Sequence, residues 1–185
     1  MKDLRVALAI THNPVGAVAE NLADIGNWTQ TAQKAGADLI CFPELNLTGY
    51  TTKEPIKSAA LTLEDPSLQK ITVIAQEAGL AVLAGFAERD QTGIIFATHL
   101  VATPNGKCHF YRKVHLSPPV LEYFSPGNAM PLFTFRGVRF GIQLCYDTHF
   151  PELSTELALA GADVIFFPHA SPRVTTEENF QSWMR

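Results

Sequence analysis

The chain has 185 residues, 46% of them hydrophobic and 17% charged, which is enough apolar material for the core of one domain spanning residues 1–185. Its 14 basic and 18 acidic residues give a net charge of −4 and form no run of like charge, which argues against nucleic acid or an anionic membrane surface as a partner. No stretch reaches the roughly 20 apolar residues of a membrane helix, and the apolar run 6–10 is too short for a signal-peptide core. These features predict a soluble, cytoplasmic protein.

The three cysteines are Cys41, Cys108 and Cys145. An odd number of thiols cannot all pair, and none of them lies in a C-x-x-C or His/Cys cluster with metal-ligand spacing. The sequence therefore indicates a reducing compartment and implies no metal and no cofactor.

The first expected element is a strand over residues 6–10. After it, a ten-residue phrase occurs twice along the chain. Residues 35–44 read AGADLICFPE, and residues 160–169 read AGADVIFFPH. Each copy follows a helical pattern, has a glycine suited to the left-handed end of a helix, and continues as a short apolar run before a proline. Each copy predicts a helix, a turn and a buried strand.

A third unit of this kind covers residues 66–88, with a helix that ends at Gly79 and a continuous apolar strand over 80–86. Such strands are typical of a sheet with parallel character and helices packed against it, so the fold class is α/β. Residues 94–102, 106–111 and 132–144 predict shorter strands, which we expect to form hairpins in the same sheet.

The second copy of the phrase is followed only by residues 170–185, which include a helix-like segment over 176–185. We therefore expect a fragment, or a fold that needs a partner to cover its open side. A long connection over 114–130 shows no periodicity, and long loops in compact domains are often functional.

Cys145 ends the alternating strand pattern of residues 138–144, and Pro151 opens a helix that Asp147 or Thr148 could cap. A thiol between a strand end and a helix N-terminus lies in a positive field, which favours the thiolate. Strand ends of this kind are also where α/β sheets place their sites. Cys145 is thus a candidate nucleophile, although most free cysteines are small buried hydrophobic residues.

Three other candidate residues are ordinary when each is considered alone. Glu44 follows the first buried strand and would reach the rim where Cys145 emerges, but it could equally be an exposed loop glutamate. Lys113 enters the long connection, where a lysine is usually a solvated charge, and Glu122 lies within that connection.

Together these residues belong to motifs that resemble those of a known family. The motifs are Phe-Pro-Glu at 42–44 with Thr-Gly-Tyr at 48–50, Tyr-Arg-Lys-Val-His-Leu at 111–116, Phe-Ser-Pro-Gly at 124–127, and Cys-Tyr-Asp at 145–147 with Phe-Pro-Glu at 150–152. In order and spacing they resemble the nitrilase superfamily of carbon–nitrogen hydrolases, in its amidase- or carbamoylase-like branch. The resemblance covers essentially the whole chain.

The resemblance implies a four-layer αββα sandwich with a Glu-Lys-Cys triad. Glu44 would be the base, Lys113 the electrophilic partner and Cys145 the nucleophile, with Glu122 matching the second glutamate of the family. The substrate-binding positions that we expect are Tyr50, Tyr146, His149 and His169. The reaction implied is the hydrolysis of a small amide by water through a thioester, without a cofactor and in a homodimer or larger homo-oligomer.

Several alternatives remain open. True nitrilases carry Trp-Glu-His after the cysteine, whereas this chain has Tyr-Asp-Thr at 146–148, which favours an amide or carbamoyl amide over a nitrile. Many relatives have an arginine where this chain has His149, so carboxylate binding there does not carry over. Relatives usually continue through further strands of the second sheet and a tail used in dimer contacts. A C-terminally truncated, catalytically impaired fragment that acts by association is therefore a second hypothesis. A hydrolase with an Asp-Lys-Cys set is a third, disfavoured by Glu44.

Overall fold

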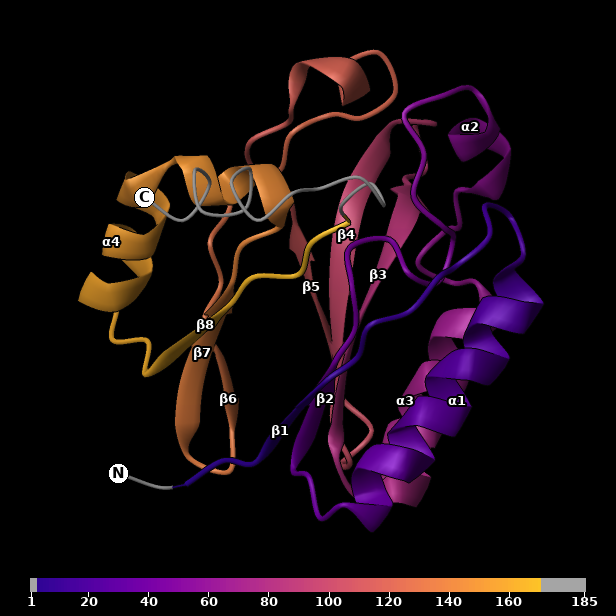
Figure 1. Ribbon diagram of the computed structural model, residues 1–185. Coiled ribbons are helices and arrows are strands. Elements are labelled where there is room, and N and C mark those ends of the chain that lie inside the picture. Colours follow the sequence, from indigo (N-terminus) through magenta and orange to yellow (C-terminus); the bar gives the residue numbers. More distant parts are fainter. Residues whose placement is uncertain (1–2, 171–185) are drawn as a thin grey trace.

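The computed structural model describes residues 3–170, in which the strands form two sheets (Figure 1). The first sheet has five strands in the order β1 (Val6–Leu8), β2 (Leu39–Cys41), β3 (Ala81–Arg89), β4 (Ile95–Ala102) and β5 (Cys108–Arg112). The second has three strands in the order β6 (Phe133–Phe135), β7 (Val138–Ile142) and β8 (Val164–Phe166). The helices are α1 (Val18–Lys34), α2 (Pro55–Ala59), α3 (Pro66–Ala78) and α4 (Pro151–Leu159), with 3₁₀ turns η1 (Pro118–Val120) and η2 (Cys145–His149).

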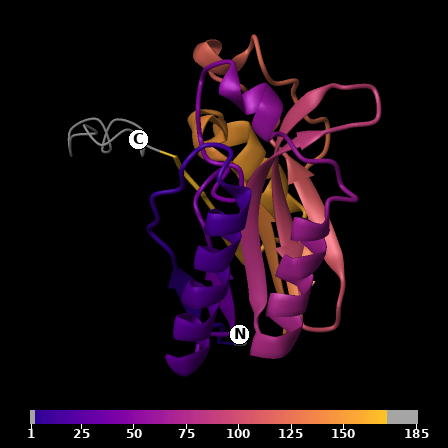
Figure 2. The ribbon, with the colours of Figure 1, turned by 90° about the vertical axis from the view of Figure 1, so that its right-hand side faces the viewer.

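The helices and sheets form four layers in the order α-β-β-α. Helices α1 and α3 lie side by side over the outer face of the first sheet (Figures 1 and 2). Helix α4 covers the second sheet, where a Cβ on Gly141 of β7 would lie 2.6 Å from the Leu157 side chain, so that this close approach requires glycine. The predicted α/β class and αββα layering are confirmed.

The two sheets pack face to face through a buried apolar cluster. Tyr111 of β5, in the first sheet, belongs to the same cluster as Phe140 and Ile142 of β7, in the second, and all three side chains are almost completely buried. Burial of large side chains of this kind contributes about 1.5–3 kcal/mol each. This cluster therefore fixes the position of one sheet relative to the other.

Local sequence accounts for the boundaries of α3. Pro66 occupies its first turn, the Asp65 carboxylate accepts a hydrogen bond from the Ser67 N–H at 2.8 Å, and Ile71 is fully buried. Gly79 ends the helix with φ 68°, a left-handed conformation that favours glycine. The predicted end of this helix is confirmed.

The repeated phrase forms the same structure in both places. β1 and β2 are parallel strands joined through α1, and β7 and β8 are parallel strands joined through α4. In the first unit the Asp38 carboxylate accepts a hydrogen bond from the Arg5 N–H at 2.8 Å, and in the second the Asp163 carboxylate accepts one from the Arg139 N–H at 2.8 Å. The molecule therefore contains two equivalent β-α-β units, one in each sheet.

One expectation about the sheets was wrong. The hairpin within residues 132–144 forms β6 and β7 of the second sheet and does not extend the first, whereas β4 and β5 do extend the first sheet. The helix-like segment over 176–185 lies outside the described residues. Between residues 3 and 170, no helix has the length and hydropathy needed to cross a membrane.

Candidate active site

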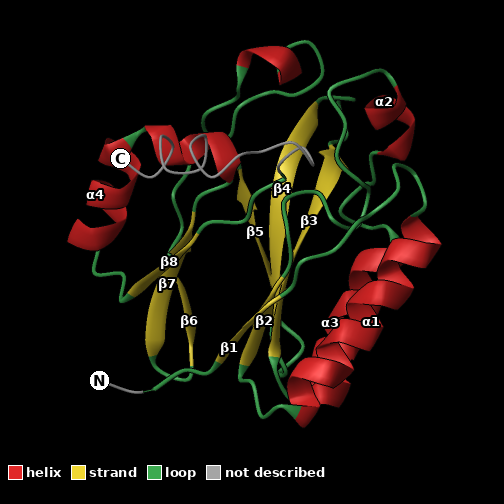
Figure 3. Ribbon diagram, viewed as in Figure 1, coloured by secondary structure: helices red, strands yellow, loops and turns green. Residues whose placement is uncertain are grey.

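Three of the candidate side chains follow the carboxyl ends of strands. Glu44 comes shortly after β2 and Lys113 directly after β5, both in the first sheet, and Cys145 comes shortly after β7 in the second. β2 and β5 point in the same direction because two antiparallel pairings separate β5 from β3, which is parallel to β2. The loops that follow these strands gather at one end of the sandwich (Figure 3).

Glu44 and Lys113 form a buried ion pair. The Lys113 Nζ lies 2.6 Å from the Glu44 Oε1, and the two side chains are only 4% and 2% exposed. Burial alone would lower the pKa of Lys113, but the charges of Glu44 and Cys145 and the hydrogen bond to Glu44 outweigh it and raise that pKa. Lys113 is therefore a fixed cation at neutral pH. The other Glu44 oxygen, Oε2, is buried without a hydrogen-bond partner among the described residues.

The turn after β2 holds the Glu44 backbone against β3. Leu45 has φ 55°, in the left-handed region that is costly for a branched residue, and the Asn46 Oδ1 accepts a hydrogen bond from the Gly85 N–H at 2.8 Å. A Cβ on Gly85 would lie 2.4 Å from the Leu45 nitrogen, so only glycine allows this approach. The carboxylate is thus presented by a tightly constrained segment.

Cys145 begins η2 with φ 47°, again in the left-handed region, and its N–H donates a hydrogen bond to the Pro168 carbonyl at 3.0 Å. Burial, and after it the charge of Glu44, raise the pKa of its thiol to about 11, because the opposing effects of Lys113 and the Ala170 backbone are smaller. The expectation that a helix field would favour the thiolate was therefore wrong. Cys145 is the first residue of a 3₁₀ turn of only five residues, and desolvation outweighs the field of this short turn. The thiol needs a base, and the Glu44 carboxylate lies near enough for its charge to act on the pKa of the thiol.

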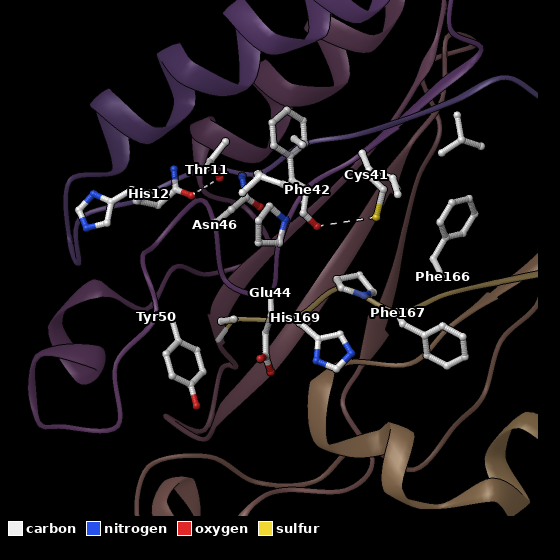
Figure 4. A pocket seen from close by; sticks show the side chains of 18 of the residues that line it. Thr11, His12, Cys41, Phe42, Glu44, Asn46, Tyr50, Phe166, Phe167 and His169 are labelled. Carbon is white, nitrogen blue, oxygen red and sulfur yellow. Dashed lines mark hydrogen bonds between the residues drawn. The ribbon is translucent and has the colours of Figure 1, made fainter. Parts of the chain in front are cut away.

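A cavity of about 1170 Å³ lies next to Glu44, the acidic member of the buried ion pair. Glu44, Tyr50 and His169 line it, and the Glu44 carboxylate points between the two rings (Figure 4). Burial raises the pKa of Tyr50, with the charges of Glu44 and Cys145 adding to the effect. Burial also lowers the pKa of His169, as do Lys113 and His149, so the imidazole is neutral. The repeated phrase thus brings Glu44 and His169 to one cavity.

The structure places the remaining predicted residues nearer the surface. Tyr146 is half-buried with its ring centroid 4.9 Å from that of His149, which is exposed. Glu122 is exposed, and the acidic groups that act on the pKa of Lys113 among the described residues are Glu44, Cys145 and Asp147. Among the described residues, no hydrogen bond or ion pair joins Glu122 to Glu44, Lys113 or Cys145.

Asp147 was not among the predicted site residues, because its position suggested a cap for the following helix. It does not cap α4, whose N-cap position is Phe150 and carries no side-chain cap bond. Its carboxylate is instead fully buried and accepts hydrogen bonds from the Tyr111 hydroxyl and two backbone N–H groups. The sequence signal that could have indicated the Tyr111–Asp147 contact is spacing, because Tyr111 lies two residues before Lys113 and Asp147 two residues after Cys145.

A thiol, a base and a fixed cation at one end of an α/β sandwich are the groups that a cysteine hydrolase requires. The chain belongs to the carbon-nitrogen hydrolase family, whose sequence model matches residues 5–185. The resemblance seen in the motifs is therefore confirmed.

Curated relatives agree with this assignment. The chain is 36% identical to an (R)-stereoselective amidase from Pseudomonas sp over 150 residues, which cover 81% of this chain and 54% of the relative. It is 38% identical over 176 residues to a hydrolase encoded in the pqqF 5′ region of Pseudomonas protegens, covering 92% of this chain and 61% of the relative. The matched part thus spans between 54% and 61% of the length of these two relatives.

Solved structures share the fold. An amidase from Nesterenkonia sp. superposes with a TM-score of 0.84 at 25% sequence identity, covering 95% of this chain and 68% of that one. The similarity extends over nearly all of this chain, which supports the four-layer assignment.

Proposed function

We propose that the protein is an amidase-like hydrolase that cleaves a non-peptide carbon–nitrogen bond of a small linear amide or carbamoyl amide through a Cys145 thioester. The observation that carries the proposal is the buried pair of Lys113 and Glu44, 2.6 Å apart, next to the half-buried Cys145. Amidase activity is also what the name of the Pseudomonas relative states for that protein.

The first half of the reaction forms the thioester. Glu44 takes the proton of the Cys145 thiol, and the sulfur bonds to the amide carbon as the carbonyl π electrons move to oxygen. Lys113 donates a hydrogen bond to this oxyanion, and so does the Tyr146 N–H, because first-turn N–H groups lack partners within their own helix. The oxyanion then collapses, the carbon–nitrogen bond breaks, and Glu44 returns the proton to the departing ammonia or amine.

The second half hydrolyses the thioester. Glu44 takes a proton from a water molecule while the water oxygen bonds to the acyl carbon, and the same two donors stabilise the second oxyanion. The carbon–sulfur bond then breaks, the acid leaves, and the proton on Glu44 returns to Cys145. One carboxylate thus serves both halves, because each half returns its proton. The side chains proposed to contact the rest of the substrate are Tyr50, Tyr146, His149 and His169.

The test is covalent trapping on the full chain. The folded protein is incubated with butyramide, propionamide, N-carbamoylalanine and propionitrile, and its intact mass is measured with and without hydroxylamine, which converts a thioester to a hydroxamate. We expect an acyl adduct on Cys145 that hydroxylamine removes. Cys145→Ala should abolish the adduct, whereas Cys108→Ala, which removes another partly buried thiol, should retain it.

Two outcomes would contradict the proposal. A folded sample that forms no adduct with any of these compounds would favour a non-catalytic fragment that acts by association. An adduct from propionitrile alone would place the chain with the nitrile-hydrolysing relatives.

A further inference from the structure

Asp147 is a fully buried carboxylate that the proposed mechanism does not use. Its Oδ2 accepts the Tyr111 hydroxyl at 2.7 Å and the Leu144 N–H at 2.9 Å, and its Oδ1 accepts the His115 N–H at 2.7 Å. A buried charge is costly unless hydrogen bonds satisfy it, and here both oxygens are satisfied. The structure therefore commits three donors to one side chain.

The positions of the three donors are informative. Tyr111 and His115 lie two residues before and two residues after Lys113, so the carboxylate binds the chain on both sides of the lysine. Leu144 directly precedes Cys145. The same carboxylate thus joins the strand end that carries the cation, in the first sheet, to the turn that carries the thiol, in the second sheet.

The turn at Cys145 needs such support. Its φ of 47° is an uncommon conformation for a non-glycine residue, which persists only where surrounding contacts enforce it. The backbone around it is held by the Leu144 N–H bond to Asp147 and by the Cys145 N–H bond to Pro168. The Asp147 N–H also donates a hydrogen bond to the Leu144 carbonyl at 3.0 Å, so Asp147 bonds to both the N–H and the carbonyl of Leu144.

We infer that Asp147 is a positioning residue that fixes the distance and orientation between Lys113 and Cys145. The inference rests on the proposed function, because it assumes that this pair acts on one substrate carbonyl. Asp147 itself touches neither reacting atom in the proposed mechanism. Its negative charge also favours the protonated Lys113, which is a second route by which it supports the cation.

The test compares matched variants of the full chain. Asp147→Asn keeps the shape of the side chain but replaces one acceptor oxygen with an amide donor that faces N–H or O–H groups. Tyr111→Phe removes only one of the three donors. The control is Asp90→Asn, because Asp90 also accepts three hydrogen bonds, from the Thr92 N–H, the Thr92 hydroxyl and the Ile94 N–H, but lies in the exposed turn between β3 and β4.

Two readouts separate positioning from a purely structural role. The first is the rate at which iodoacetamide alkylates Cys145 in samples shown to be folded by urea titration, which requires no turnover. The second is kcat and KM for butyramide. Misplacement of reacting groups by about 1 Å costs up to about 100-fold in rate, so we expect Asp147→Asn to lower kcat about 10- to 100-fold and leave KM nearly unchanged. Alkylation should slow as well, Tyr111→Phe should show the same pattern more weakly, and Asp90→Asn should match the wild type.

The inference is overturned if folded Asp147→Asn retains wild-type alkylation and kcat, or if only its KM changes. If Asp147→Asn does not fold, Tyr111→Phe decides, and wild-type rates in that variant would overturn the inference. Failure of the proposed function gives a different result: the wild type would be alkylated at Cys145 but would release no ammonia from butyramide. The alkylation rates of the variants would then still report on Asp147.

Discussion

Replacing Lys113 with Met removes the cation of the buried pair while keeping an unbranched side chain only one atom shorter. Glu44 would then be a nearly fully buried carboxylate. Its Oε2 already lacks a partner within residues 3–170, and its Oε1 would lose the Lys113 contact at 2.6 Å. Removing one partner of a buried pair costs about 3–5 kcal/mol, because the remaining charge stays desolvated. That is a large share of the roughly 5–15 kcal/mol that stabilises a domain.

The measurement is urea unfolding at pH 7, with activity assayed in parallel. Lys113→Met should lose about 3 kcal/mol or more. Adding Glu44→Gln should restore much of the stability without restoring activity. The control is Lys57→Met, whose partner Glu54 is 72% exposed, and a surface pair of this kind contributes at most about 1 kcal/mol.

A result in which Lys113→Met and Lys57→Met lose equal stability would refute this reasoning, because it would mean that water reaches Glu44 freely. For the proposed oxyanion contact, kcat of Lys113→Met should fall at least about 100-fold, since one such donor is worth about 3–4 kcal/mol.

Three further predictions follow from the geometry. Because burial and Glu44 raise the pKa of Cys145 to about 11, its alkylation rate should rise about tenfold per pH unit between pH 7 and 10. Glu44→Gln should shift this pH profile to lower pH, and a plateau in the wild-type rate below pH 8 would contradict the raised pKa of the thiol. Gly85→Ala should displace the turn at Leu45, costing about 1–3 kcal/mol in urea unfolding together with most of the activity, and an active, stable variant would argue against that constraint. Gly26→Ala, in the middle of α1 with only an ordinary contact at 3.8 Å, should raise the free energy of unfolding by up to about 1 kcal/mol in the same titration and leave activity unchanged.

Much of the fold was predictable because its signals are local. Continuous apolar runs and left-handed glycines identified the strands and helix ends, and the repeated phrase predicted a helix, a turn and a strand in each of the two β-α-β units. The sheet to which β6 and β7 belong was not predictable in this way. A hairpin pattern records pairing between neighbouring strands, whereas membership of a sheet depends on partners far away in the sequence, such as β8.

In the candidate site, too, local sequence signals were informative and contacts between distant residues were not predictable. The motifs and their spacing predicted Glu44, Lys113 and Cys145 as candidate site residues, and the structure places the first two in direct contact. The direction of the Cys145 pKa shift could not be predicted, because it depends on desolvation and on a carboxylate from the other sheet. Asp147 was taken for a helix cap, since an aspartate before a proline-initiated helix usually has that role and its distant donors are invisible in the local sequence.

The division of the site between two sheets gives the packed interior a second role. Glu44 and Lys113 are attached to the first sheet and Cys145 to the second. The separation of the proposed base and nucleophile is therefore set by the thickness of the layer between the sheets, which includes Tyr111 and Phe140. A substitution that changed the volume of this layer would alter the reaction geometry without touching a reacting group. Selection for turnover would therefore constrain these apolar positions more tightly than selection for stability alone, and catalytic rate could be tuned by repacking the interior.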